Sequence, residues 1–199
     1  MNILITYAIP QERVAVSLPE CTITYCETGI GKVNAALAVV DAIETAKPDL
    51  ILNIGTAGSV DREVDSIVIC DTFVDRDMKK CKDFGVTYHL DFKEELKTVF
   101  LVKNWDTNNI CNTGDSFVTR IIDEADAFDM ENFAVAALCK RRGIPFVSVK
   151  YITDKIGENS VKHWEDKLED ANAGLQRFFD SCNGKSNYAG NSSAESSPR

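Results

Sequence analysis

Short apolar runs alternate along this chain with segments in which apolar residues recur every three or four positions. The short runs are typical of buried strands, and the longer period indicates helices with one apolar face. An alternation of strands and helices predicts a layered α/β fold around a mostly parallel central sheet. The expected strands are Ile3–Tyr7, Thr22–Tyr25, Leu50–Asn53, Ser66–Phe73, Asn109–Cys111 and Pro145–Ile152.

Three segments carry the helical period. In the first, between Gly31 and Pro48, apolar side chains recur at i, i+3, i+4 and i+7 and predict one apolar face. The second, Glu131–Arg142, is rich in alanine, and its small side chains would let a helix lie close on a sheet. A third, amphipathic helix is expected from Trp164 to Cys182. The predicted apolar face of the first helix consists of Val33, Ala36, Leu37, Val40 and Ile43.

One domain and a tail are expected. The 199 residues, 44% of them hydrophobic, are enough for a single domain with a full core. We assign this domain to residues 1–183, because every predicted strand and helix lies there. Residues 184–199 are mostly serine, asparagine, glycine and alanine with almost nothing to bury, and this composition predicts a disordered polar tail.

Composition narrows the class of protein. A net charge of −9 argues against nucleic acid or a membrane as the main partner. No apolar run reaches the ~18 residues of a membrane helix, and the N-terminus lacks the basic flank of a secretory signal. The seven cysteines fall mostly in apolar segments, as Cys70, Cys111 and Cys139 do, which favours reduced thiols in a cytoplasmic protein. No Cys/His cluster indicates a metal, and we expect neither a metal nor a cofactor.

Acidic residues follow several predicted strands. Asp154 comes after the strand Pro145–Ile152, Asp129 and Glu131 come after a short apolar run, and Glu12 follows the first strand. Carboxylates in such positions lie at the mouth of an α/β sheet, where ligands bind. Each also has a purely structural interpretation. Asp154 could cap a turn, Asp129 could be a polar strand-end residue, and the two glutamates could be acids in the first turn of a helix.

Two glycine-rich segments could approach a ligand closely. Thr28–Lys32 opens the first long helix, and Gly55–Gly58 follows the strand Leu50–Asn53, so both are expected to be turns. Glycines in turns let backbone N–H groups approach an anion or a ligand. Neither segment is a Walker loop or a dinucleotide-binding fingerprint, and each alone is equally consistent with a turn that binds nothing.

Six motifs follow one another at plausible spacings: Thr28–Lys32, Lys47–Asp49, Asn53–Gly58, Gly114–Val118, Asp129–Glu131 and Ile152–Asp154. Together they resemble the purine nucleoside phosphorylase/nucleosidase superfamily, and most of all the 5′-methylthioadenosine/S-adenosylhomocysteine nucleosidases. The resemblance extends from Met1 to about Cys182. It implies a three-layer α/β/α sandwich with a mixed, mostly parallel central sheet. It also implies an enzyme that breaks the N-glycosidic bond of a purine nucleoside.

The resemblance assigns the reacting groups. Asp154 matches the acid that protonates purine N7, and Thr153 matches a hydroxyl that supports this acid. Met130 and Glu131 match the pair that binds the ribose, with the glutamate on the 2′- and 3′-hydroxyls. Glu12 matches the carboxylate that activates the attacking water. General acids and bases of this kind typically contribute about 10²–10⁴-fold each to the rate.

The resemblance also assigns residues around the base and the water. Lys150 stands where these nucleosidases usually have an arginine near the water, and lysine keeps the charge without the forked geometry. Asp129 replaces the usual glutamate. The chain is shorter than its relatives between Asp83 and Asn109, where they build the pocket for the 5′-substituent. The residues matching the purine pocket are Phe117 and Val118, and those matching the loop around the base and the water are Thr56, Ala57 and Gly58.

Three functions remain open from the sequence. Hydrolysis is favoured over phosphorolysis, because the N-terminal turn Ala8–Arg13 lacks a phosphate-binding loop and Glu12 would repel the anion. The third possible function is that of a catalytically weak relative that only binds a nucleoside. The resemblance further implies a homodimer, for which Arg76–Met78 is a candidate contact, although the same region could be an interior loop instead.

Overall fold

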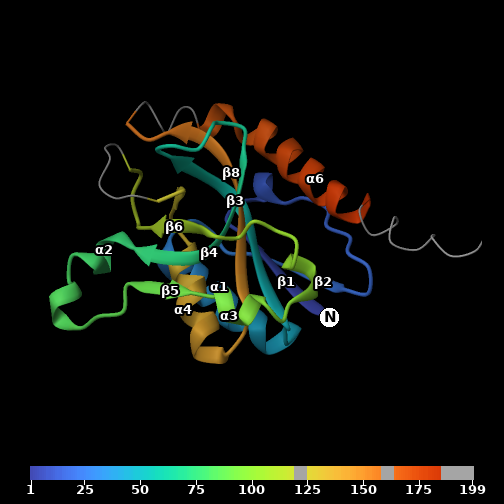
Figure 1. Ribbon diagram of the computed structural model, residues 1–199, viewed down its shortest axis with the longest axis horizontal. Coiled ribbons are helices and arrows are strands. Elements are labelled where there is room, and N and C mark those ends of the chain that lie inside the picture. The colour runs from blue at the N-terminus through green and yellow to red at the C-terminus, as the bar shows by residue number, and fades with distance from the viewer. Residues whose placement is uncertain (119–124, 158–163, 185–199) are drawn as a thin grey trace, which may run out of the picture.

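The computed structural model of the chain describes residues 1–118, 125–157 and 164–184 (Figure 1). Within these residues eight strands form one sheet, flanked by helices. The strands are β1 (Asn2–Tyr7), β2 (Thr22–Glu27), β3 (Leu50–Ser59), β4 (Ile67–Asp75), β5 (His89–Asp91), β6 (Asn109–Thr113), β7 (Ala127–Asp129) and β8 (Phe146–Lys155). The helices are η1 (Pro10–Glu12), α1 (Lys32–Ala46), α2 (Arg76–Lys79), η2 (Lys82–Phe84), α3 (Lys93–Leu96), η3 (Phe100–Val102), α4 (Asn132–Arg142) and α6 (Leu168–Gly184).

The sheet is mixed and mostly parallel, as predicted. Its strands lie in the order β2-β1-β3-β7-β6-β4-β5, and β8 pairs with both β3 and β4. Strands β3, β8, β4, β6 and β7 therefore close into a ring. Three pairings are antiparallel, namely β3 with β7, β4 with β5 and β4 with β8, whereas the other five are parallel.

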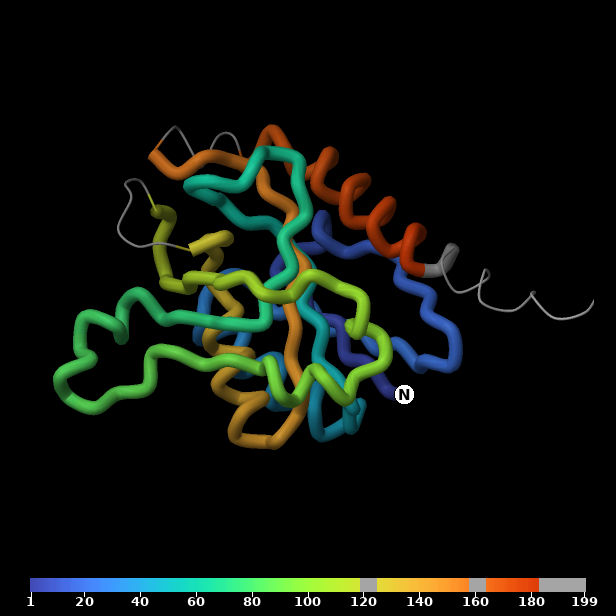
Figure 2. Tube along the Cα trace, viewed as in Figure 1, coloured from blue at the N-terminus to red at the C-terminus, as the bar shows by residue number. Residues whose placement is uncertain are grey.

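Helices cover both faces of the sheet, which confirms the predicted three-layer arrangement. Helices α1 and α4 pack against each other and against β1, β4 and β6 on one face (Figures 1 and 2). Helix α6 covers β3 and β8 on the opposite face. Its Gly174 lies so close to Tyr151 of β8 that an added Cβ would come within 2.1 Å of the ring. A larger residue at this position would push the helix off the sheet.

Two strands extend further than the sequence predicts. Gly55–Gly58, expected as a turn, lies inside β3, which continues to Ser59. Asp154, expected just beyond a strand, lies inside β8. The reason is that β3 and β8 pair in parallel along almost their whole length, so backbone hydrogen bonds continue where the apolar pattern has ended. Strand β5 has only three residues and was not predicted.

The predicted apolar face of α1 is confirmed at Ile43, which is buried, but it is wrong at Val33 and Leu37, which are 69% and 64% exposed. Ala35 and Val39, which lie outside the predicted face, are buried together with Ile43. The buried set follows an i, i+4, i+8 spacing, so the helix is rotated away from the face expected from its larger side chains. A row of apolar side chains on α1 is thus left on the surface.

Three further predictions concern the cysteines, membrane helices and the C-terminal tail. Cys70, Cys111 and Cys139 are buried thiols. No helix in the described part of the chain is long and apolar enough to cross a membrane. The predicted tail, 184–199, lies outside the described residues except for Gly184, where α6 ends.

Candidate active site

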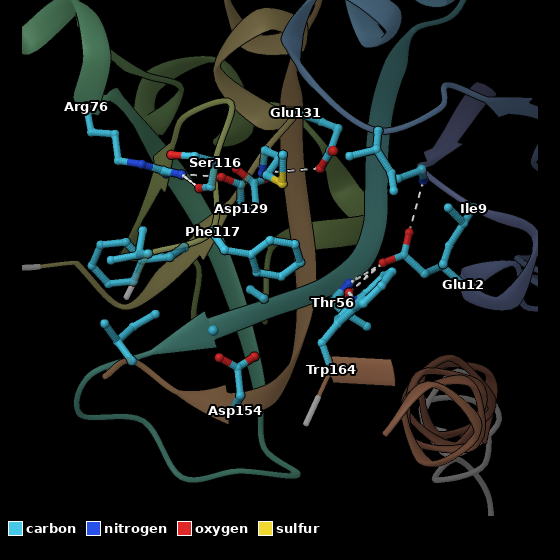
Figure 3. A pocket seen from close by; sticks show the side chains of 18 residues that line it. Ile9, Glu12, Thr56, Arg76, Ser116, Phe117, Asp129, Glu131, Asp154 and Trp164 are labelled. Carbon is cyan, nitrogen blue, oxygen red and sulfur yellow. Dashed lines mark hydrogen bonds between the residues drawn. The ribbon is translucent and has the colours of Figure 1, made fainter. Parts of the chain in front are cut away.

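A cavity opens where the ends of β1, β3, β7 and β8 meet (Figure 3). Three carboxylates, Glu12, Glu131 and Asp154, point into it from separate stretches of the chain. The lining residues are Ala8, Ile9, Glu12, Ile30, Thr56, Ala57, Gly58, Arg76, Ser116, Phe117, Val118, Phe128, Asp129, Met130, Glu131, Asp154, Ile156 and Trp164.

Gly58 of β3 is the point at which these strands converge. It pairs with Asp154 of β8 on one side and with Phe128 of β7 on the other. The register shifts at this position, because Ala57 pairs with Ile152 and Thr153 is an extra residue in β8. Such a bulge bends a strand and redirects the side chain that follows it. Here it lies directly before Asp154.

Close contacts require glycine on β3. A Cβ on Gly58 would lie 3.0 Å from Asp154 Oδ2 and 2.8 Å from Ile156 Cδ1. A Cβ on Gly55 would lie 3.1 Å from Glu12 Oε1. The two glycines therefore make room for two of the three carboxylates, which is a role different from the turn expected of them.

Glu12 is held by three donors and is only 4% exposed. The backbone N–H and the hydroxyl of Thr56 both donate to Oε1, at 2.8 and 2.7 Å. The backbone N–H of Ala8 donates to Oε2 at 3.0 Å. The three bonds hold the carboxyl group of Glu12 in one orientation at the cavity wall.

Asp154 is 5% exposed and lies on the wall opposite Glu131 (Figure 3). Thr153 does not line the cavity, but its Oγ1 lies 2.8 Å from Asp154 Oδ1 and 3.3 Å from the carbonyl oxygen of Ala57. The threonine thus ties the carboxyl group of Asp154 to β3.

Glu131 lies at the start of α4 and accepts a hydrogen bond from the backbone N–H of Gly31 at 2.9 Å. The pKa of Glu131 is raised to about 7, and burial is the largest cause. The carboxylate of Asp129 contributes to this rise, whereas the ammonium group of Lys150 opposes it.

Lys150 lies behind the cavity wall, where it forms a fully buried ion pair with Asp129 at 3.1 Å. Burial alone would lower the pKa of Lys150, but the carboxylate of Asp129 raises it above its ordinary value. Asp129 also accepts hydrogen bonds from the Thr113 hydroxyl at 2.6 Å and from the Asn132 backbone at 3.1 Å. The carboxylate of Asp129 is therefore both ion-paired and hydrogen-bonded inside the protein.

The loop after β6 is fixed by Arg76. This guanidinium is 5% exposed and donates to the carbonyl oxygens of Asn112, Asp129, Gly114 and Ser116. These bonds join the ends of β6 and β7 to the segment that carries Phe117. Arg76 is therefore interior, as the second interpretation of the Arg76–Met78 region expects, whereas Met78 is 37% exposed.

The structure brings most of the predicted site together. Nine of the eleven predicted residues line the cavity, and the other two, Thr153 and Lys150, bond to carboxylates that do. Arg76 and Trp164 were missed as site residues. Trp164 was assigned to the apolar face of a helix, and nothing in its local pattern indicates a polar contact. No cluster of His, Cys, Asp or Glu within the described ranges could hold a metal ion.

The chain belongs to the phosphorylase superfamily, whose family pattern it matches over residues 11–99 and 112–182. A curated relative from Marinomonas sp. (strain MWYL1) is named 5′-methylthioadenosine/S-adenosylhomocysteine nucleosidase. It is 32% identical over 169 residues, which cover 72% of each chain.

Solved structures show the same fold. A Helicobacter pylori nucleosidase mutant with 5′-methylthioadenosine in its active site superposes with a TM-score of 0.77 at 18% identity, over 92% of this chain and 98% of the other. The apo Arabidopsis thaliana 5′-methylthioadenosine nucleosidase gives a TM-score of 0.75 at 19% identity, over 94% and 96%. These likenesses confirm the predicted architecture.

Proposed function

We propose that the protein is a purine nucleosidase that hydrolyses the N-glycosidic bond of 5′-methylthioadenosine or S-adenosylhomocysteine, releasing adenine and the thioribose. The observation that carries this proposal is the convergence of Glu12, Glu131 and Asp154 on one cavity. The names of the curated relatives support the reaction and the substrate class.

Asp154 is the proposed general acid. Departure of a neutral purine needs a proton on the base, and the buried carboxyl group of Asp154 can supply it at N7. Thr153 holds this carboxyl in one orientation. Phe117 and Val118, with the β3 residues Ala57 and Gly58, are the proposed walls of the purine pocket. The 41% exposure of Phe117 leaves an aromatic face accessible to a base.

Glu131 and Met130 are the proposed ribose-binding pair. As the purine leaves, the sugar acquires oxocarbenium-like positive charge, and an ionised Glu131 on the hydroxyl side would stabilise it. Glu12 is the proposed base for the attacking water. Two carboxylates that act as acid and base on opposite sides of a sugar also carry out glycoside hydrolysis.

Phosphorolysis is the alternative on the same fold. A phosphate ion would need several cations or N–H donors that are free to converge on it. Among the described lining residues Arg76 is the one cation, and its terminal nitrogens donate to backbone carbonyls. Glu12, the proposed base, would lie at the far face of the sugar, where it would repel the anion. The geometry therefore favours water over phosphate.

The direct test is release of the free purine base from methylthioadenosine, adenosylhomocysteine, adenosine and inosine in phosphate-free buffer. We expect turnover of the first two and formation of the free thioribose. Strict dependence on phosphate with release of a sugar phosphate would contradict hydrolysis. Tight binding of adenine nucleosides without any release of base would instead identify a binding protein.

The cellular location, the oligomeric state and the pathway are also part of the proposal. We infer a cytoplasmic homodimer that acts in methionine salvage, as the resemblance to nucleosidases implies. The exposed apolar row on α1, with Val33 and Leu37, supports an interface between two copies, because a surface of this kind is commonly covered by a partner.

A further inference from the structure

Trp164 is linked to Glu12, the proposed base for the attacking water, by hydrogen bonds through the side chain of Thr56. Its indole Nε1–H donates to Thr56 Oγ1 at 2.9 Å. The same Thr56 oxygen is the donor to Glu12 Oε1 at 2.7 Å. Figure 3 shows these three side chains in a row on one wall of the cavity. We call these two consecutive hydrogen bonds, from Trp164 to Thr56 and from Thr56 to Glu12, the relay.

The indole fixes the direction of this relay. An indole N–H can only donate, so Thr56 Oγ1 must accept from Trp164. A hydroxyl has a single proton, and the nearest acceptor left for that proton is Glu12 Oε1. Without the indole, the hydroxyl could rotate and accept from a water molecule or from another donor instead. Trp164 therefore orients the Thr56 hydroxyl toward the carboxylate.

The consequence at Glu12 is a difference between its two oxygens. Oε1 receives two hydrogen bonds, both from Thr56, which occupy its two lone pairs. Oε2 receives one, from the backbone of Ala8, and keeps one lone pair. A water molecule that loses its proton to Glu12 would therefore bind at Oε2.

We propose that Trp164 is a positioning residue for hydrolysis, acting through Thr56 to commit Glu12 Oε1 to the protein and to leave Oε2 as the atom that takes the proton from water. This inference rests on the proposed function. It depends on the indole N–H, because an aromatic ring without an N–H would fill the same space but could not direct the hydroxyl. The ring also packs edge-to-face against Phe117, with centroids 6.0 Å apart.

The test is a double-mutant cycle that uses Trp164→Phe and Thr56→Val, with adenine release as the readout. Loss of one such hydrogen bond typically lowers a rate about three- to tenfold, so Trp164→Phe should lower kcat by this factor while KM stays within about twofold. In the Thr56→Val background the indole has no hydroxyl to orient, and Trp164→Phe should then have no further effect on kcat. In a Thr56→Ser background, which retains the hydroxyl, the loss should persist.

A matched control separates the relay from aromatic packing. Trp105 packs against Phe178 and Phe179 away from the cavity, and Trp105→Phe should leave kcat unchanged. An equal loss from Trp164→Phe with and without the Thr56 hydroxyl, or an equal loss from Trp105→Phe, would overturn the proposal.

A measurement without substrate gives an independent answer. In protein labelled with 15N-tryptophan, Thr56→Val should move the indole N–H resonance of Trp164 and leave that of Trp105 in place. An unmoved Trp164 resonance would overturn the relay. Wild-type protein that releases no adenine would refute the proposed function, whereas a moved resonance in that same protein would still support the contact.

Discussion

Glu12, Glu131 and Asp154 each have different partners in the cavity, and their proposed roles follow these differences. Glu12 accepts three hydrogen bonds from donors on β3 and on the first loop. Asp154 is bonded by the neighbouring Thr153. Glu131 has one close backbone donor and lies near the buried pair Asp129–Lys150. A set of acids in distinct environments is the arrangement by which a site can contain an acid and a base at the same pH.

Asp154→Asn tests the general acid. The amide has nearly the same shape but cannot transfer a proton to the purine, so kcat should fall by about 10²–10⁴ while the melting temperature changes little. Initial rates of adenine release and a thermal melt measure the two effects. The exposed Asp83, changed to asparagine, is the matched control and should retain full activity. Wild-type kcat in Asp154→Asn would remove this residue from the mechanism.

The pH dependence tests Glu131. Its pKa is raised to about 7, chiefly by burial, and the proposed role needs the carboxylate, so kcat/KM should rise with pH to a plateau above about 7. Lys150 lowers that pKa, and Lys150→Met should therefore move the acid limb to higher pH. Lys150→Arg keeps the charge and serves as the control. An acid limb at the same pH in Lys150→Met would contradict this coupling.

The raised pKa of Glu131 also makes the stability of the folded state depend on pH. The folded protein holds the proton on Glu131 up to about pH 7, whereas the ordinary pKa of the group is 4.5. The folded state therefore binds more protons than the unfolded state between these values, and the contribution of Glu131 to stability falls as the pH rises from about 4.5 to about 7. Above that range its contribution is constant.

At the scale of elements, helix α1 presents its larger apolar side chains to solvent. Val33 and Leu37 are exposed, while the smaller Ala35 lies against the rest of the fold with Val39 and Ile43. The N-terminus of this helix also adjoins the cavity, because Gly31 donates to Glu131 and Ile30 is a lining residue. A second copy on this face would lie next to the site.

Leu37→Glu tests that interface. A charge at a side chain that is 64% exposed should leave the fold intact but separate a dimer into monomers, because burying an unpaired carboxylate is costly. Light scattering coupled to size exclusion measures the mass, and circular dichroism checks the fold. Phe100, which is 90% exposed and lies outside α1, gives the control Phe100→Glu, for which we expect an unchanged mass. A wild-type monomer would refute the homodimer.

At the scale of the whole molecule, the cavity exists only in the folded chain, since its walls come from segments between Ala8 and Trp164. A ligand that binds only the folded state stabilises it by mass action. Adenine at 100 times its Kd should add about 2.7 kcal/mol, or a rise of about 5–10 °C in melting temperature for a chain of this size. Cytosine is the control. Equal shifts with both bases would contradict a purine pocket.

Much of the fold was predictable, because strands such as β1 and the first half of β3 are continuous apolar runs. The predictions were wrong where long-range pairing outweighs local composition. Gly55–Gly58 has the composition of a turn, yet β8 supplies hydrogen-bond partners along it and it remains a strand. Likewise, the period of α1 locates the helix, but the face that it buries depends on how closely α4 and β1 can approach.

The sequence by itself determined the types of chemistry available: three acids near strand ends, a family pattern and a core large enough for one domain. Only the tertiary structure decided that these acids share one cavity, that Arg76 is an interior residue and that Trp164 reaches Thr56. The physical reason is that the local period of apolar residues indicates which side chains are buried, but not which distant residues they contact. Contacts between residues as distant as Glu12, Thr56 and Trp164 depend instead on the pairing of β3 with β8 and on the packing of α6.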